Sequence, residues 1–430
     1  MKAKFLASVL TGAMFAIALA GCGGQQGGST AGGSAGGGGA AKVAEVKIGN
    51  ILPLSGPAAP LGELGKKARE LAAEEINAAG GIKSLGGAKL KLIFADSQGK
   101  PQVGVAEAER LITQEKVSLL TGTYQSGVAI PVSEVAERYK VPFFAPVPSD
   151  DSITQRGFKY LWRLADTSEM RVIAQSQFLD DLNKTQGAGL KTVYLIYENT
   201  AWGQGVAKSW KKYLPEKGFQ IVGEEAYPQG SSDFTPLANK VKAANPDVVL
   251  LTSYVADASL LTNTFAEQKV TPKVFLGTSG GYSDPVYLKN TGENAEYFFD
   301  VSSWETDVRR PHVQEINEKF QQKFGVLPSN EAVKAYVAMY VIKDVLERAG
   351  SLEADKIRDA FNQTNITEGI TQVYAPTIKF DDKGQMISQA LVIAQYRKVN
   401  GKIERVTVWP EKEARSPEFK PVLFPGWDKK

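Results

Sequence analysis

Small hydroxyl residues and aromatic residues recur in the loops that follow the predicted strands of this sequence. Hydroxyl groups and the free N–H groups at the start of a helix bind carboxylates, whereas aromatic rings cover an apolar body. The pattern therefore indicates a site for a small acid with an apolar part, although each ring could instead only seal its loop against the core. These loops are 55–57, 123–127, 147–150, 199–203, 253–257 and 278–282, with the aromatics Tyr124, Trp202, Tyr254 and Tyr282.

A second chemistry is suggested by the segment Gly277-Thr-Ser-Gly-Gly281, which matches the G-x-S-x-G motif of serine hydrolases directly after a predicted strand. Asp300 and His312 follow in the order serine, acid, histidine. The motif needs a helix immediately after its serine, but residues 280–285 favour a turn. Serine hydrolysis therefore stays a remote alternative, and we expect no catalytic residues.

Metal and cofactor sites are not supported by the residue types. The chain has one histidine and one cysteine, which are too few for a transition-metal site. The segment Gly203-Gln-Gly205 opens a predicted helix after a strand, but Lys208 stands where a dinucleotide-binding fingerprint needs its third glycine. We expect neither a metal nor a cofactor.

The elements that must position these loops alternate regularly between strand and helix. The first half predicts strands at 46–52, 90–95, 118–122 and 142–145, with helices between them. The second half predicts strands at 192–197, 220–226, 248–252 and 273–276. Such alternation implies parallel sheets covered by helices on both faces. The fold class is therefore α/β, with two doubly wound parallel-sheet lobes of one architecture.

Beyond residue 300 the pattern is less regular. Helices are expected around 312–324, 330–349 and 355–361, and strands at 378–380 and 390–397, joined by the turn Asp381–Gly384. These elements are too few for a third domain. We expect them to complete the two lobes, which requires the chain to pass between the lobes more than once.

The N-terminal sequence predicts a targeting signal rather than a part of the folded domain. Two lysines precede a short apolar run, so residues 1–21 form a signal peptide. The end of this run, Leu19-Ala20-Gly21-Cys22, resembles the bacterial lipobox, which predicts lipid attachment at Cys22. Residues 23–41 are rich in glycine and predict a flexible tether. We therefore expect a lipoprotein anchored on the extracytoplasmic side of a membrane.

Composition excludes several functional classes. The chain has 430 residues, 50 Lys plus Arg and 47 Asp plus Glu, with charged residues at 23% and hydrophobic residues at 43%. This near balance of charge leaves no basic surface for nucleic acid. The hydrophobic fraction is that of a globular protein rather than a multi-span membrane protein. One cysteine allows no internal disulfide, and the length predicts two domains.

Five segments carry a resemblance to the leucine/isoleucine/valine-type solute-binding proteins of ABC importers. The resemblance covers residues 44–400 in order, and it implies a type I periplasmic-binding fold with three hinge crossings. Crossings are expected at 165–167, 298–301 and 374–378. Lobe 1 would comprise 42–166 and 299–376, and lobe 2 would comprise 167–298 and 377–430. The segments are Ile51-Leu-Pro-Leu-Ser-Gly-Pro57, Glu74-Glu-Ile-Asn-Ala-Ala-Gly-Gly-Ile82, Tyr124-Gln-Ser-Gly-Val-Ala129, Lys140-Val-Pro-Phe-Phe-Ala145 and Asp381-Asp-Lys-Gly384.

The resemblance implies roles for individual residues. Ser126 and Ser149 match hydroxyls that hold the ligand carboxylate, and Val147 matches a carbonyl contact to its ammonium. Trp202 and Tyr254 match aromatics of the second lobe beside the ligand. The implied protein captures a small, hydrophobic amino acid as a monomer and delivers it to an ABC permease.

Two positions depart from the family pattern. Leu61 stands where a tyrosine can occur, and Ser279 stands where a glutamate meets the ammonium. A buried ammonium needs a counter-charge. Either Asp257 supplies it or the ligand is a carboxylate or amide without an amino group. Asp257 could instead be a helix N-cap. A separate alternative for the whole protein is a ligand-sensing module rather than a carrier.

Overall fold

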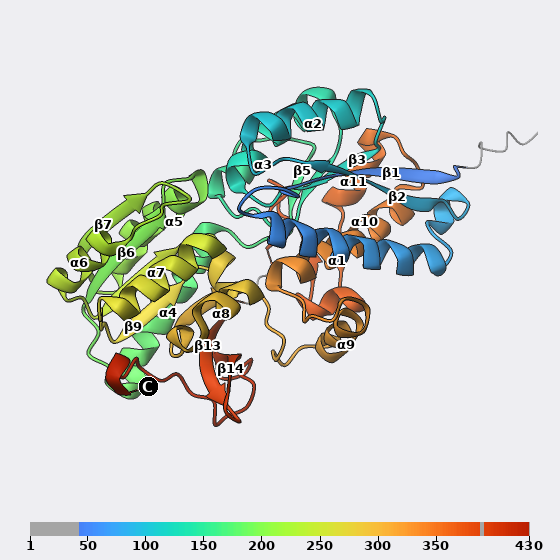
Figure 1. Ribbon diagram of the computed structural model, residues 1–430. Coiled ribbons are helices and arrows are strands. Elements are labelled where there is room, and N and C mark those ends of the chain that lie inside the picture. The colour runs from blue at the N-terminus through green and yellow to red at the C-terminus, as the bar shows by residue number, and fades with distance from the viewer. Residues whose placement is uncertain (1–42, 388–390, 430) are drawn as a thin grey trace, which may run out of the picture. The chain divides into compact units, whose positions relative to one another are not determined.

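The computed structural model describes residues 43–387 and 391–429, and it contains two separate layered sheets (Figure 1). The first sheet has five parallel strands in the order β2-β1-β3-β4-β5. Ile51 of β1 lies opposite Gly122 of β3, so the loops after these two strands begin side by side. The strands are β1 (Glu45–Leu52), β2 (Lys89–Asp96), β3 (Leu119–Gly122), β4 (Phe143–Ala145) and β5 (Leu161–Arg163).

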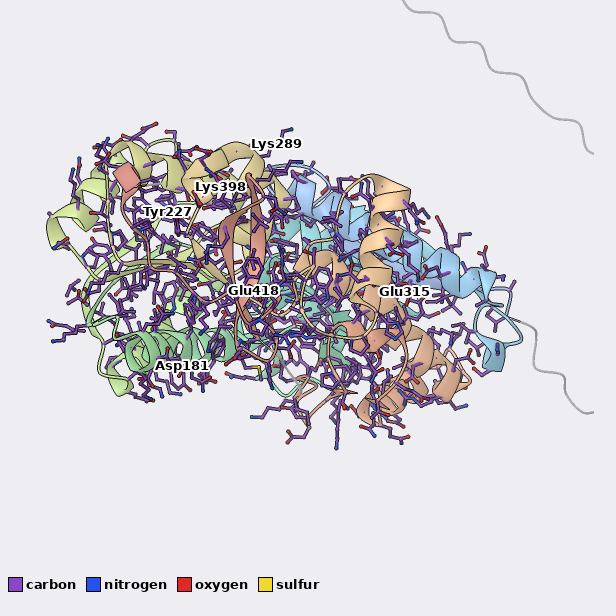
Figure 2. The ribbon with its side chains drawn as sticks, turned by 90° about the horizontal axis from the view of Figure 1, so that it is seen from below. Asp181, Tyr227, Lys289, Glu315, Lys398 and Glu418 are labelled. Atoms are coloured by element: carbon purple, nitrogen blue, oxygen red, sulfur yellow. The ribbon has the colours of Figure 1, made fainter. Side chains whose placement is uncertain are left out.

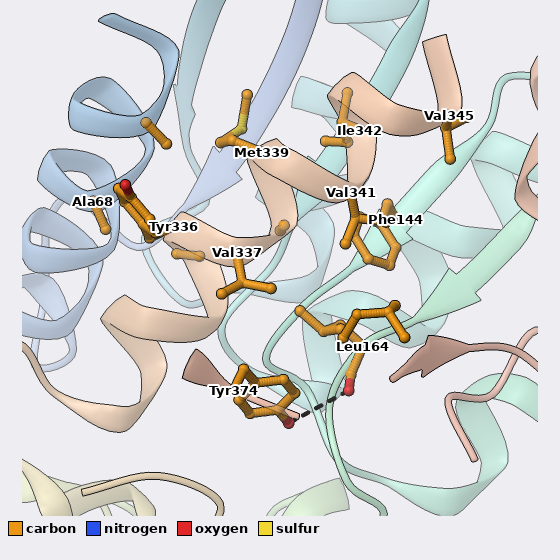
Figure 3. Packing of buried hydrophobic residues seen from close by; sticks show 14 of the residues in the cluster. Ala68, Phe144, Leu164, Tyr336, Val337, Met339, Val341, Ile342, Val345 and Tyr374 are labelled. Carbon is orange, nitrogen blue, oxygen red and sulfur yellow. Dashed lines mark hydrogen bonds between the residues drawn. The ribbon is translucent and has the colours of Figure 1, made fainter. Parts of the chain in front are cut away.

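Helices cover both faces of this first sheet because its strand residues point alternately to either side. Ile48, Leu119 and Phe144 face one core with α1 (Ala59–Ala78), α10 (Asn330–Ala349) and α11 (Ala354–Asn362), as Figure 3 shows for Ala68, Phe144 and Val341. Their neighbours Leu120 and Phe143 face the other core with α2 (Pro101–Thr113) and α3 (Ser126–Tyr139). Helix α9 (Val313–Phe324) joins the first core through Ile316 and Phe320.

The second sheet has seven strands in the order β14-β13-β10-β9-β8-β6-β7, of which the last five in this order run parallel. The hairpin β13–β14 adds two antiparallel strands at one edge. The strands are β6 (Thr192–Glu198), β7 (Gln220–Tyr227), β8 (Val248–Thr252), β9 (Val274–Gly277), β10 (Phe299–Ser302), β13 (Val392–Val399) and β14 (Lys402–Trp409).

Helices also lie on both faces of the second sheet. Helices α4 (Ser168–Gln186) and α5 (Ala201–Glu216) bury Phe178 and Trp210 on one face. On the other face lie α6 (Thr235–Ala244), α7 (Val255–Glu267) and α8 (Pro285–Thr291). The expected α/β class with two doubly wound layers is confirmed, because each sheet is parallel at its centre and sandwiched between helices.

Several elements were missed by the sequence reading. Helix α4 was not expected, although Thr167 caps it by accepting from the N–H of Met170 and Gly187 ends it in the left-handed conformation. Its apolar residues lack a clear helical stripe because the helix is buried over much of its surface. The short strands β5 and β10 were also missed, because strands of three or four residues carry little periodic signal. The eight-residue edge strand β14 was missed as well.

Two of the expected crossings are displaced. Residues 299–302 pair with β9 and β13, so the chain leaves the second sheet after Ser302 rather than within 298–301. Residues 378–386 stay with the first layer, since Ile378 and Met386 lie in its core and Gln385 bridges to Arg163 of β5. The turn Asp381–Gly384 therefore joins Phe380 to Met386, not to β13. We therefore expect the third crossing after residue 387.

These pairings refine the lobe boundaries, which stay a prediction. We propose that lobe 1 comprises 43–166 and 303–387, and that lobe 2 comprises 167–302 and 391–429. The short pair β11 (Asn365–Ile366) and β12 (Ile378–Lys379) then belongs to lobe 1. The signal peptide, Cys22 and the tether lie outside the described residues.

The outer surface carries charges of both signs. Lys289 of α8, Glu315 of α9 and Glu418 near the C-terminus, which Figure 2 labels, are exposed. Within the described residues, no helix is long and apolar enough to cross a membrane.

Candidate functional site

A small pocket lies where the loops after the strands of both sheets meet. Its walls come from the loops after β3 and β4 in lobe 1 and from those after β6, β8 and β9 in lobe 2, together with α4 and α10. We call it the cleft pocket. It is lined by Tyr124, Ser126, Val147, Pro148, Ser149, Arg171, Trp202, Tyr254, Gly280 and Glu331.

Six of the eight predicted ligand-binding residues line this pocket. They are Tyr124, Ser126, Val147, Ser149, Trp202 and Tyr254. Their roles toward a ligand stay predictions. The reason they meet is that ligand-facing loops of parallel sheets follow the carboxyl ends of the strands, and two such edges face each other here.

The lobe 1 side of the pocket is polar. Ser126 is the first residue of α3, and its Oγ accepts hydrogen bonds from the backbone N–H groups of Ser149 and Asp150, both at 3.2 Å. The Ser126 hydroxyl keeps its own hydrogen to donate. Ser149 lies beside it, and its hydroxyl contacts no partner within hydrogen-bonding distance among the described residues. Two hydroxyls and the positive end of a helix therefore meet on this side.

The lobe 2 side of the pocket is aromatic. The Trp202 and Tyr254 rings lie 5.1 Å apart, and Tyr254 reaches across the cleft to Tyr124 of lobe 1 at 5.8 Å. All three side chains are buried. The Nε1 donor of Trp202 has no hydrogen-bond partner among the described residues. These rings offer an apolar cover, and the indole N–H of Trp202 is free to donate to a ligand.

Asp257 does not line the cleft pocket. Its carboxylate accepts from the N–H of Gly230 at 3.0 and 3.2 Å, and burial raises its pKa. The alternative N-cap role is wrong, because α7 begins at Val255 and its N-cap position is Tyr254. Asp257 holds the loop around Gly230 instead.

Ser279 lies just behind the pocket wall. It is fully buried with a backbone φ of +64°, and its N–H donates to Asp300 at 2.6 Å. Its hydroxyl donates to Glu331 at 3.1 Å. Glu331 reaches the pocket from the first turn of α10, 52 residues further along the chain. Ser279 stands where the family has a glutamate, and its hydroxyl therefore contacts an acid from another part of the chain, Glu331.

Glu331 and Arg171 are the pocket residues that sequence reasoning missed. Glu331 follows the N-cap Ser329, so it reads as an ordinary acid in a first helical turn. Arg171 lies on α4, the helix that was not expected. No local signal distinguishes either residue from a surface charge.

Arg171 and Glu331 belong to a buried charge network with Asp166 and Lys334. Asp166 forms ion pairs with Arg171 and with Lys334, the latter at 3.0 Å. Burial alone would raise the pKa of Asp166, but the two bases hold it well below its usual range. Burial lowers the pKa of Lys334. Asp166 stands at the first crossing, so this network joins α4 of lobe 2 to α10 of lobe 1.

The hydrolase arrangement does not form. A 3₁₀ turn at Gly280–Ser283 follows Ser279, where the motif needs an α-helix. Asp300 pairs with Arg405, and His312 pairs with Glu315 at the start of α9. Among the described residues, no group of three or more His, Cys, Asp or Glu side chains could hold a metal ion.

Comparison with known proteins identifies the family. Residues 45–402 match the model of a family described as periplasmic binding protein, which is most of the chain. The chain belongs to this family of periplasmic binding proteins. A relative from Brucella suis biovar 1 (strain 1330), Leu/Ile/Val-binding protein homolog 7, is 32% identical over 383 residues, which cover 87% of this chain and 93% of that protein.

Solved structures share the fold of this periplasmic binding protein. The branched-chain amino acid transporter substrate-binding protein LivJ of Streptococcus pneumoniae, in complex with isoleucine, aligns with a TM-score of 0.72 at 23% identity, over 84% of this chain and 99% of that one. A solute-binding protein of an ABC transporter from Rhodopseudomonas palustris BisB5, in complex with 3,4-dihydroxybenzoic acid, aligns with a TM-score of 0.74 at 20% identity, over 90% and 99%. One fold thus serves amino acids and aromatic acids.

Proposed function

We propose that this periplasmic binding protein is the solute receptor of an ABC importer, capturing a small amino acid or a related carboxylate and delivering it to a membrane permease. One observation carries the proposal. The hydroxyls of Ser126 and Ser149 in lobe 1 face the rings of Trp202 and Tyr254 in lobe 2 across a single pocket. A ligand that touches both sides links the lobes, so binding favours the closed cleft.

The polar side of the pocket orients the ligand. Ser126, Ser149 and the N-terminus of α3 bind its carboxylate, since donors and a positive helix end stabilise an anion. Tyr124, Trp202 and Tyr254 enclose its apolar part. The carbonyl of Val147 accepts a hydrogen bond from a donor group of the ligand.

Ligand entry requires the lobes to separate. The cleft pocket leaves room for about 20 Å³, which is the space of a single water molecule. An amino acid cannot enter a space of this size. The ligand therefore binds to an open form, in which the rings of lobe 2 have moved away from Ser126 and Ser149, and the cleft closes over it.

The location of the protein follows from its N-terminal sequence and its family. We place it outside the cytoplasmic membrane, held there as a monomer by lipid on Cys22 with residues 23–41 as the tether. Metabolic labelling with a fatty-acid analogue tests the anchor. We expect label on the wild-type chain and none on the Cys22→Ala variant.

A thermal-shift screen tests the proposed function. The ligands are the twenty amino acids, their 2-oxo acid analogues, simple amides and benzoates. A ligand at a hundred times its dissociation constant raises the free energy of unfolding by about 2.7 kcal/mol, which is a clear shift. We expect stabilisation by one class of small carboxylate. A screen in which no carboxylate stabilises the protein contradicts the proposed function.

A further inference from the structure

Glu331 is a buried acid with access to the cleft pocket. It lies in the first turn of α10, where Ser329 caps the helix by accepting from the N–H of Ala332 at 3.2 Å. Its side chain is 5% exposed and lines the pocket. An acid at this position also stabilises the helix dipole, but that role requires neither burial nor contact with a ligand pocket.

The partners of Glu331 are hydroxyls rather than bases. Ser279 donates to it at 3.1 Å, and Ser283 lies at 3.4 Å from both carboxylate oxygens. Within the described residues, no lysine, arginine or histidine nitrogen comes within 4.0 Å of this carboxylate. The other buried acids nearby differ, because Asp166 pairs with Arg171 and Lys334 while Asp300 pairs with Arg405.

The nearest bases act on Glu331 only from a distance. Arg171 and Lys334 both interact electrostatically with Glu331, but their direct ion pairs are with Asp166. The network thus has two negative charges, on Asp166 and Glu331, and two positive charges, on Arg171 and Lys334. A ligand that brings only a negative charge would leave the network with an excess of negative charge in a buried site, which is costly. A zwitterionic ligand keeps the balance.

We propose that Glu331 binds the ammonium group of the ligand, so the ligand is an amino acid rather than a simple acid. This inference rests on the proposed function and adds the residue that selects the ligand class. The ammonium donates to the carboxylate of Glu331, while the ligand carboxylate lies at Ser126 and Ser149. A charge-assisted hydrogen bond in a buried pocket is stronger than one between neutral groups.

This placement has a mechanical consequence. Glu331 on α10 and Ser126 on α3 both belong to lobe 1, so one lobe holds both charged ends of the ligand in the open form. Ser279 and Ser283 then reach Glu331 from lobe 2 as the cleft closes. The same carboxylate therefore contacts the ligand and the opposite lobe, which couples recognition to closure.

Isothermal titration calorimetry with matched ligand pairs tests the inference. Each pair is an amino acid and its 2-oxo acid, for example L-leucine and 4-methyl-2-oxopentanoate, which differ in the ammonium group. For the best-binding pair of the wild-type protein, we expect the amino acid to bind at least about 30-fold more tightly than the 2-oxo acid. This comparison needs no variant and is independent of folding defects.

A variant then assigns the effect to one side chain. Glu331→Gln keeps an acceptor for Ser279 and removes the charge. We expect it to weaken amino-acid binding by about 30-fold or more while 2-oxo acid affinity stays within about threefold or improves. Glu318→Gln, an exposed acid on α9, is the matched control and should leave both affinities unchanged.

The outcomes separate the two proposals. If 2-oxo acids or benzoate bind the wild-type protein as tightly as amino acids, or if Glu331→Gln retains amino-acid affinity, the role of Glu331 is wrong while the receptor function stands. If no small carboxylate binds the wild-type protein, the proposed function fails and the inference fails with it.

Discussion

The carboxylate of Asp166 and the ammonium of Lys334 form an ion pair of 3.0 Å in which neither side chain is exposed. Asp166 lies in the first crossing between the lobes, and Lys334 lies on α10 of lobe 1. Asp166 also pairs with Arg171 on α4 of lobe 2, and Ser303, beside the second crossing, donates to it at 2.7 Å. One carboxylate thus ties together two crossings and both lobes next to the cleft pocket.

Removing the charge of Asp166 should strongly destabilise the protein. Asp166→Asn leaves Arg171 and Lys334 buried without their counter-charge, and breaking a buried ion pair costs about 3–5 kcal/mol. Urea unfolding measures the loss. The control is Glu45→Gln, whose partner Lys91 and own side chain are about half exposed. Such a surface pair contributes no more than about 1 kcal/mol, and equal losses in both variants would contradict the central role of Asp166.

The stability of the protein should depend on pH through Asp284. Burial raises the pKa of this carboxyl to about 6. The folded state then holds a proton that the unfolded chain has released, so stability is greatest below about pH 4 for this group and falls as the pH rises to about 6. Asp284→Asn removes this dependence and keeps an acceptor for the N–H of Val286.

Chemical denaturation of both proteins at pH 4.5 and pH 7 measures this effect. Between the two pH values, we expect the free energy of unfolding of the variant to rise relative to that of the wild type by up to about 2 kcal/mol. Asp166 contributes in the opposite sense, because its lowered pKa gives stability that is lost on acidification, but this contribution is common to both proteins. A stability difference that stays constant with pH would show that Asp284 titrates normally.

Two serine variants should separate binding from folding. Ser126→Ala removes the acceptor of two backbone N–H groups, so it should lower both stability and ligand affinity, each by about 1–3 kcal/mol. Ser149→Ala removes a hydroxyl that forms no hydrogen bond with a described residue, so it should lower affinity by a similar amount at nearly unchanged stability. Calorimetry and urea unfolding give the two quantities. Unchanged affinity of Ser149→Ala would remove this residue from the site.

A methyl group at Gly280 should disturb the aromatic side of the pocket. A Cβ there would lie 2.5 Å from the ring of Trp202, and the backbone φ is +62°. Gly280→Ala should therefore displace Trp202 and weaken binding by about tenfold, as overpacking typically costs 1–3 kcal/mol. The control is Gly325→Ala, which shares a positive φ but has open space around its Cβ. Equal affinity of both variants would indicate that Trp202 does not shape the site.

The sequence alone determined the layered architecture and indicated the hydroxyl and aromatic side chains of the pocket, but not its charged side chains. Strand and helix patterns are local, because apolar residues repeat at two or 3.6 residues along the chain. The alternation therefore located most of the parallel strands, and their carboxyl ends predicted the loops that carry Ser126, Ser149, Trp202 and Tyr254. That these loops belong to two facing lobes was implied by the family resemblance. Short strands such as Leu161–Arg163 and the buried helix α4 were lost because their periodic signal is weak.

Only the tertiary structure decided which charges reach the pocket. Ser279 and Glu331 are 52 residues apart and touch, whereas Asp257 stands close to Tyr254 in sequence and bonds to Gly230 instead. Whether an acid in a first helical turn faces water or a cleft depends on how its helix packs against a distant layer. Side-chain pattern fixes local structure, but the order of strands and the path of the crossings determine which residues meet.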